Sequence, residues 1–351
     1  MRKEGILTPP VQQSGDIPPE PALDPGRPII DPHLHLWDIL PAPGSPQEPI
    51  RFLFRELLAM VAASGHAISH SVYVESHMMH RCDGPAELRS LGETEFANGI
   101  AAMSASGNYG PARIAHRIVG TADLRLGDQV KPVLEAHVAA AGERFAGIRM
   151  DTAFSEAGLF GFPGDPGRRS TLRDHAFRTG ARVLADMGLS LDVWCVQGQL
   201  NDVIALADAV PTLTIVLDHV GTPETHGQWR GREAEGFADW ASKIGELARR
   251  PNVRVKLGGL GMDITRSIPS TPGRASGEAL AAHWRPAIET CIAAFSPERA
   301  MFESNFPPDQ AAGSYGATWN AFKIIAKDYS ETEQDQLFRR TAAETYRIAI
   351  P

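Results

Sequence analysis

The sequence has 351 residues, 43% of them hydrophobic and 22% charged, and a formal net charge of −8 at pH 7. This length suits an α/β barrel with insertions, and the composition is that of a soluble globular protein rather than a disordered or membrane protein. The acidic balance and the lack of a dense Lys/Arg block argue against a nucleic-acid partner, and no stretch approaches the roughly 20 apolar residues that cross a bilayer. The three cysteines, Cys82, Cys195 and Cys291, suggest neither a disulfide framework nor a thiolate zinc motif, so a reducing cytoplasm is the expected location.

The first 27 residues contain six prolines and few large apolar side chains. They lack the apolar centre of a signal peptide, so the sequence predicts an extended arm over residues 1–27. Residues 28–351 then form one domain. Such an arm could pack on a neighbouring subunit, which leaves a homo-oligomer open.

The segment 28–38, PIIDPHLHLWD, is predicted to be the first strand. Because side chains alternate between the two faces of a strand, His33 and His35 point the same way, and Asp31 shares their face. Two such histidines can be an accidental pair that faces solvent. Their place at the end of an apolar run instead favours the C-terminal rim of a barrel, where active sites lie.

Seven further strand-like segments follow, and they alternate with helical patterns and with loops rich in Gly and Pro. Because no hairpin turn joins them, they predict a parallel sheet, and eight strands are the number that closes a (β/α)8 TIM barrel. An open doubly wound sheet is the alternative, although no Gly-x-Gly-x-x-Gly or P-loop motif for a nucleotide is present. The segments are 69–75, 117–123, 145–150, 189–196, 212–219, 252–258 and 300–305.

Polar residues stand at the ends of these strands, and in a closed barrel they converge on one mouth. Two histidines of the first strand, His33 and His35, and His219 of the sixth can bind a divalent metal ion and leave positions open for water and substrate. Arg149 is either a clamp for a substrate carboxylate or a structural ion pair. The other candidates for substrate contacts are Glu75 with His77, Asp192 or Trp194, and Lys256.

The eighth strand places Glu303 and Asn305 on one face. With Asn305 at the mouth, Glu303 lies one layer deeper, where partial burial would raise its pKa toward the range of a general base. The competing interpretation is a structural carboxylate that pairs with Lys256, which could itself be a buried ion-pair partner or bind an anion.

Six motifs resemble, in combination, the amidohydrolase superfamily. More narrowly they resemble the amidohydrolase-2 branch of TIM-barrel metal-dependent hydrolases, with its fuconolactonase-like, rhamnonolactonase-like and 2-pyrone-4,6-dicarboxylate lactonase-like enzymes. The resemblance runs from about Ile29 to Tyr346. The motifs are DPHLHLWD at 31–38, VYVES at 72–76, GIR at 147–149, IVLDHVGTP at 215–223, VKLGGLGM at 255–262 and FESNFPPD at 302–309.

The resemblance implies a metal or substrate centre lined by His33, His35 and His219. It also implies a metal-bridging lysine on the fourth strand of the binuclear members, where this chain has Arg149. We therefore expect at most one divalent ion, with zinc as the candidate. Some lactonases of the branch are thought to work without a metal, so metal-independent chemistry stays open.

The family also has an aspartate at the end of the eighth strand, as a metal ligand or as the base that activates water. This chain has Asn305 there. An amide cannot take a proton from water at neutral pH, so the usual base is missing. Either Glu303 replaces it, or Asp309 reaches in from the following loop, or the chemistry differs.

The leading functional prediction is hydrolysis of a small lactone or cyclic ester that carries a carboxylate. Glu303 would be the base, His219 and Asn305 would complete the catalytic set, and Arg149 would hold the anionic group. The alternatives are nonoxidative decarboxylation of an aromatic acid and a barrel that has lost catalysis and only binds a ligand. The long loops 82–95, 158–170, 222–231 and 267–276 would form the walls of the site, but they do not name the substrate.

Overall fold

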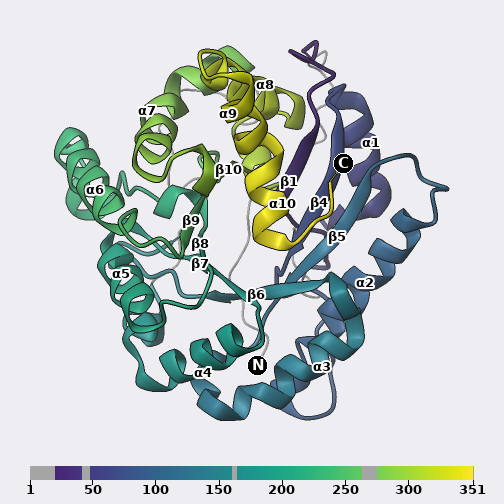
Figure 1. Cartoon of the computed structure of the whole chain (residues 1–351), viewed down its shortest axis with the longest axis vertical. Coiled ribbons are helices and arrows are strands. Elements are labelled where there is room, and N and C mark those ends of the chain that lie inside the picture. Colours follow the sequence, from purple (N-terminus) through teal and green to yellow (C-terminus); the bar gives the residue numbers. More distant parts are fainter. Residues whose placement is uncertain (1–19, 42–47, 160–163, 263–274, 351) are drawn as a thin grey trace.

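The computed structural model describes residues 20–41, 48–159, 164–262 and 275–350, and it contains the predicted parallel barrel (Figure 1). The strands hydrogen-bond in chain order, each parallel to the next. They are β1 Ile29–Leu34, β4 Ile68–Val74, β5 Arg113–Gly120, β6 Phe145–Asp151, β7 Ser190–Trp194, β8 Ile215–Leu217, β9 Val253–Leu257 and β10 Ala300–Phe302.

The first and last strands meet just beyond the end of β10, which nearly closes the barrel. The backbone N–H of Asn305 donates to the carbonyl oxygen of His33 at 3.0 Å, and that of His35 donates to the carbonyl oxygen of Phe306 at 2.8 Å. A parallel bridge also joins Leu34 to Phe306. These contacts bring the histidine strand beside the FESN segment, which the sequence places some 270 residues later.

Helices surround the barrel, and several begin with a side-chain cap (Figure 1). Asp174 accepts from the N–H groups of Ala176 and Phe177 at the start of α4, and Ser276 caps α7 in the same way. The helices are α1 Phe54–Ser64, α2 Leu91–Ala105, α3 Lys131–Ala141, α4 His175–Asp186, α5 Leu200–Ala209, α6 Glu233–Leu247, α7 Gly277–Phe295, α8 Tyr315–Ala326, α9 Glu331–Asp335 and α10 Thr341–Tyr346. In the described part of the chain, no helix has the length and apolar character to cross a membrane.

The interior of the barrel changes from apolar to polar along its strands. Val216 and Met301 belong to a small apolar cluster that α10 covers with Tyr346. Asp218 and Glu303 stand two residues further along the chain, directly after the ends of β8 and β10, and continue the same face. Burial of the apolar layer thus fixes which side chains point into the barrel and places carboxylates above it.

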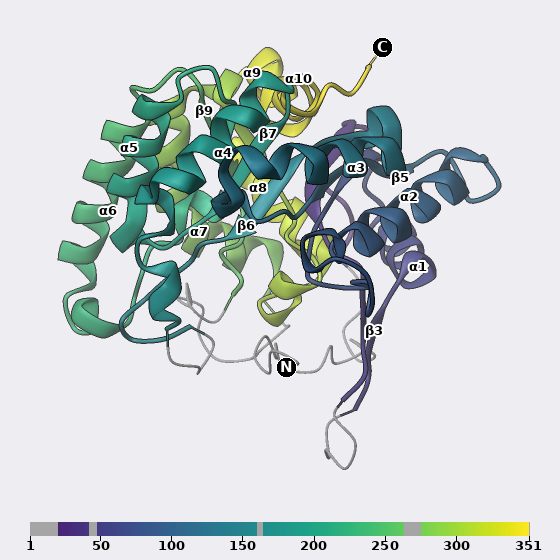
Figure 2. The ribbon, with the colours of Figure 1, turned by 90° about the horizontal axis from the view of Figure 1, so that it is seen from below.

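A short antiparallel hairpin, β2 Trp37–Ile39 with β3 Ile50–Phe52, follows the first strand. The sequence predicts a single strand over 28–38 here, and the structure divides this segment between β1 and β2. The hairpin pairs Trp37 with Phe52 and Ile39 with Ile50. Its turn, residues 42–47, lies outside the described residues. Figure 2 shows the hairpin extending away from the barrel.

The described part of the predicted arm, residues 20–27, packs on this same chain. Asn320 of α8 accepts from the N–H of Leu23 at 2.8 Å. Lys323 of α8 donates to the carbonyl oxygens of Leu23 and Asp24 at 2.8 and 2.7 Å. Residues 1–19 lie outside the described residues, so packing of the arm on a neighbouring subunit stays a prediction.

Candidate active site

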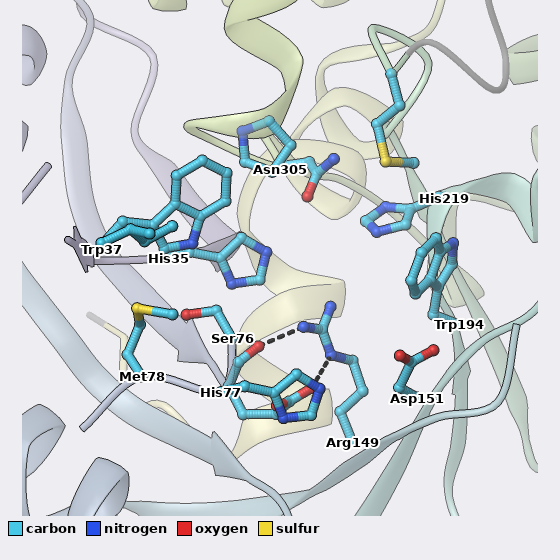
Figure 3. Close-up of a pocket in the computed structure, with 14 residues that line it drawn as sticks. His35, Trp37, Ser76, His77, Met78, Arg149, Asp151, Trp194, His219 and Asn305 are labelled. Carbon is cyan, nitrogen blue, oxygen red and sulfur yellow. Dashed lines mark hydrogen bonds and ion pairs between the residues drawn. The ribbon is translucent and has the colours of Figure 1, made fainter. Parts of the chain in front are cut away.

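A pocket of about 690 Å³, including its open mouth, lies at the carboxyl ends of the strands (Figure 3). Trp37 of the hairpin and Trp194 of β7 stand on opposite sides of it in this view. Trp37 and Asp151 were not among the predicted site residues, although each stands two residues beyond one of them, His35 and Arg149. The lining residues are His35, Trp37, Ile39, Glu75, Ser76, His77, Met78, Arg149, Asp151, Trp194, His219, Met262, Asn305 and Pro308.

The two histidines of the first strand face each other inside the barrel. Both are buried, and their Nε2 atoms lie 3.2 Å apart. His35 Nδ1 lies 2.8 Å from the carbonyl oxygen of Val74 and must donate to it, which leaves the lone pair of its Nε2 directed at His33. Period-two alternation therefore predicted the geometry of this pair correctly.

Glu303 lies fully buried between two imidazoles. Its Oε1 accepts from His219 Nδ1 at 2.7 Å and from the His219 backbone N–H at 3.1 Å, while its Oε2 lies 2.8 Å from His33 Nδ1. Burial alone would raise the pKa of Glu303, but the adjacent His219 and His33 outweigh it and hold the pKa well below its usual range. The predicted raised pKa is therefore wrong, and so is the alternative that Lys256 is its main partner.

His219 directly follows Asp218, and its side chain lines the pocket. Its backbone has a positive φ of 56°. Burial opposes its protonation, but Glu303 and Asp218 raise its pKa above the ordinary value. The close approach of Gly259 fixes its ring, because a Cβ at Gly259 would lie 2.3 Å from His219 Cγ. In the neutral form of His219, with Nδ1 donating to Glu303, Nε2 is left as an acceptor for the pocket.

Lys256 does not line the pocket. It is fully buried, donates to Asp192 at 2.7 Å, and its Nζ lies 3.0 Å from both Asp218 Oδ1 and His33 Nδ1. Tyr346 of α10 donates to the same oxygen of Asp192 at 2.6 Å. The expected substrate contact by Lys256 is thus corrected to a buried ion-pair network beneath His33, and Asp192 belongs to that network.

Arg149 lines the pocket, but its guanidinium is already paired. Its Nε donates to Glu75 Oε1 at 2.8 Å, and its Nη2 donates to the Glu75 carbonyl oxygen (Figure 3). Its Nη1 lies 3.3 Å from His33 Nε2. Glu75 in turn lies 3.4 Å from His77. The structure therefore brings Glu75, His77 and Arg149 together as predicted, with the charge of Arg149 balanced by Glu75.

The buried charges of this network do not cancel. Four carboxylates, Glu75, Asp192, Asp218 and Glu303, face two fixed cations, Lys256 and Arg149. Their formal balance is minus two, and an uncompensated buried charge is costly. A bound divalent cation, or protonation of neighbouring imidazoles, would supply the missing positive charge.

The donor set fits one divalent cation. Two nitrogen ligands of a tetrahedral zinc ion, each bound at roughly 2.0–2.1 Å, lie about 3.3 Å apart, close to the 3.2 Å between the Nε2 atoms of His33 and His35. His33, His219 and Glu303 also offer atoms within 4.8 Å of one another. The Glu303 separations of 2.7 and 2.8 Å are shorter than this ligand–ligand distance, so His33 and His35 are the better pair.

Asn305 lines the pocket and binds Asp309 behind it. Its Nδ2 donates to Asp309 Oδ1 at 2.8 Å. Asp309 is buried, and burial raises its pKa to about 7. Asp309 is not among the residues that line the pocket. It therefore reaches the site through Asn305, rather than directly as the sequence analysis considered.

Comparisons with known proteins place this geometry in a family. The family model described as Amidohydrolase matches residues 30–348. Uncharacterized protein y4mH of Sinorhizobium fredii is 32% identical over 341 residues, which cover 91% of this chain and 98% of that protein. L-fucono-1,5-lactonase of Burkholderia multivorans is 30% identical over 243 residues, 68% of this chain and 74% of the relative.

A solved structure agrees with these matches. A crystal structure of an amidohydrolase from Burkholderia multivorans with bound zinc has a TM-score of 0.69 and 25% identity to this chain, and the match covers 92% of this chain and 100% of that one. The fold and the resemblance drawn from the strand-end motifs are thereby confirmed. The chain belongs to the amidohydrolase family.

Proposed function

We propose that the protein is a lactonase that opens a small cyclic ester with an activated water molecule in this pocket. The observation that carries the proposal is the buried His219–Glu303 pair, which leaves the Nε2 of His219 free as a proton acceptor. The similarity to an L-fucono-1,5-lactonase supports the reaction class. Such a reaction needs a positioned base, and an imidazole held by a carboxylate is well suited to that role.

His219 takes the role of base that the sequence analysis gave to Glu303. Both oxygens of Glu303 lie at hydrogen-bond distance from imidazole nitrogens, so this carboxylate orients His219 and stabilises its protonated form. His219 Nε2 accepts a proton from water as the oxygen attacks the lactone carbonyl. The ring C–O bond then breaks, and the same proton passes to the leaving alkoxide, which yields a hydroxy acid.

One divalent ion, with zinc as our candidate, would be held by His33 and His35. When bound, it would polarise the lactone carbonyl. Its charge would also offset the excess of buried carboxylates. The zinc-bound structure of the related amidohydrolase supports the choice of metal.

The walls of the pocket favour a substrate rich in hydroxyl groups. Arg149 is paired with Glu75, and Asp151, which lines the same pocket, is paired with Arg168, so a substrate carboxylate would meet a guanidinium whose charge is already balanced. The carboxylates of Glu75 and Asp151 can accept hydrogen bonds from hydroxyl groups. Trp37 and Trp194 offer apolar faces to a ring. We therefore propose a neutral polyhydroxy lactone ahead of the carboxylate-bearing lactone expected from Arg149.

A panel of lactones tests the proposal by acid release at constant pH. We expect turnover of neutral sugar lactones, with kcat reduced by about 10²–10⁴-fold in His219→Gln because the base is lost. His175→Gln, which changes an exposed histidine of α4, should keep wild-type activity. Protein freed of metal by chelation should lose most of its activity and recover it with zinc.

Two controls separate the alternatives. His33→Gln and His35→Gln should each lower the zinc content measured by mass spectrometry, whatever the activity. Release of carbon dioxide from aromatic acids, with no acid release from any lactone in metal-loaded and metal-free protein, would replace the lactonase proposal by a decarboxylase. Preference for carboxylate-bearing lactones would overturn the substrate assignment alone.

A further inference from the structure

Asn305 lines the pocket, and Asp309, which does not line it, binds the Asn305 side chain. Its backbone has a positive φ of 50°, and its carbonyl oxygen accepts from the N–H of Asp309 at 3.1 Å. Its side-chain Nδ2 donates to Asp309 Oδ1 at 2.8 Å. Two hydrogen bonds thus join the residue that lines the pocket to one that does not.

Asp309 is itself fixed in place. It lies on the single turn Pro308–Ala311 and is 1% exposed. Its second oxygen, Oδ2, accepts from the backbone N–H of Gly261 at 3.1 Å, in the loop after β9. A Cβ at Gly261 would lie 2.9 Å from the Asp309 carbonyl oxygen, so the loop can approach this closely only with glycine. Both carboxylate oxygens therefore have a backbone or side-chain donor.

This arrangement determines which way the amide of Asn305 points. Above its pKa of about 7 the Asp309 carboxylate is ionised and only accepts hydrogen bonds, so it faces the NH2 group of the amide and not its oxygen. The opposite arrangement would bring two oxygens to 2.8 Å. With Nδ2 directed at Asp309, Oδ1 is left for the pocket, and Figure 3 shows the side chain of Asn305 directed into it.

We propose that Asp309 is a positioning residue for lactone hydrolysis: it holds the Asn305 amide so that Oδ1 accepts a hydrogen bond from the attacking water. Water has two protons. One is directed at His219 Nε2, which removes it, and the other at Asn305 Oδ1, which leaves a lone pair of the water oxygen aimed at the lactone carbonyl. The inference rests on the proposed function, because it names the water that this reaction consumes.

The amide cannot take the proton, so its contribution is orientation. A misplaced nucleophile typically costs on the order of 10²-fold in rate. We expect Asp309→Ala and Asn305→Leu each to lower kcat by about 10–100-fold while KM changes less than about threefold. Both substitutions abolish the same effect, the orientation of water by the held Asn305 amide. The double variant should therefore be no slower than the slower single variant.

A reciprocal exchange distinguishes positioning from a merely structural contact. Asn305→Asp alone sets two carboxylates against each other and should be the least active variant. Adding Asp309→Asn restores one donor opposite one acceptor, so the exchanged pair should recover at least tenfold over Asn305→Asp. Asp174→Ala, which removes the cap of α4, serves as the control and should lower thermal stability with kcat unchanged. Additive losses in the Asp309→Ala/Asn305→Leu cycle, or no recovery by the exchanged pair, would overturn the proposal.

A second measurement does not depend on turnover. In ¹⁵N-labelled protein at pH 8, the side-chain NH2 resonance of Asn305, assigned by its loss in Asn305→Leu, should exchange slowly with solvent, and Asp309→Ala should speed its exchange at least tenfold. Rapid exchange in the wild type would overturn the inference. Slow exchange in a protein that opens no lactone would confirm the held amide and refute the lactonase proposal alone.

Discussion

Lys256 is the cation at the centre of the buried ion-pair network. It lies fully buried within 3.0 Å of oxygens of both Asp192 and Asp218. Its removal leaves two carboxylates without their cation, and breaking a buried pair from one side typically costs about 3–5 kcal/mol. We expect Lys256→Met to lower the free energy of unfolding by about that amount, measured by urea denaturation.

A matched lysine provides the control. Lys243 pairs with Asp239 at 2.6 Å near the surface of α6, where an ion pair contributes about 0–1 kcal/mol. Lys243→Met should therefore change the stability little. Adding Asp192→Asn to Lys256→Met should recover part of the loss, because one unpaired charge is removed. A loss below about 1 kcal/mol in Lys256→Met would show that the network is not ionised as described.

Among the elements, the loop after β9 depends on glycine for its approach to His219. Gly259 has a φ of 66°, and a Cβ there would lie 2.3 Å from Nδ1 and Cγ of His219. Gly259→Ala should therefore displace the imidazole from Glu303, and we expect at least a 100-fold loss of lactonase kcat. The measurement is steady-state turnover together with circular dichroism, which should show the fold retained.

Gly245 in α6 is the comparison, because a Cβ there would have no heavy atom within 4 Å. Alanine is favoured over glycine inside a helix by about 1 kcal/mol. Gly245→Ala should thus leave turnover unchanged and raise stability slightly. Equal turnover in the two variants would refute the role of Gly259 as the contact that fixes His219.

The elements also show what the sequence could and could not predict. Strand periodicity placed His33 beside His35 and Glu303 below Asn305, because a period of two depends only on local geometry. The partners of Glu303 could not be predicted, since His219 and His33 are 84 and 270 residues away in the chain and meet it only through closure of the barrel. The hairpin after the first strand was missed because its turn is long and rich in proline.

Lys256 illustrates the same limit. Its position at a strand end predicted an inward side chain, and the structure confirms that direction. The position of Lys256 along the barrel axis, below His33 and not at the mouth, depends on how neighbouring strands are staggered. Asp309 stands behind Asn305 because of a turn that no periodic pattern describes. Sequence therefore predicted which side chains point into the barrel, and tertiary packing decides which of them line the pocket.

At the scale of the whole molecule, several buried or half-buried histidines have a lowered pKa, which favours their neutral form. His137 is fully buried against Phe145 with a ring separation of 5.1 Å, and its Nδ1 lies 2.8 Å from Thr94 Oγ1. Burial lowers its pKa to about 4, and it lowers the pKa of His66 and His116 to about 4 as well. In the unfolded chain these imidazoles regain ordinary pKa values near 6.5.

This difference makes the protein sensitive to acid. Through these three histidines the unfolded chain binds more protons than the folded one between pH 6.5 and 4, so their contribution to stability falls as the pH falls through this range. Each such histidine contributes at most about 1.4 kcal/mol per pH unit. We expect the free energy of unfolding, measured with urea, to decrease steadily from pH 7 to pH 5. His137→Gln should flatten this slope, and the exposed His175→Gln should not. An unchanged slope in His137→Gln would mean that His137 is protonated in the folded protein, which its buried contact with Thr94 and Phe145 argues against.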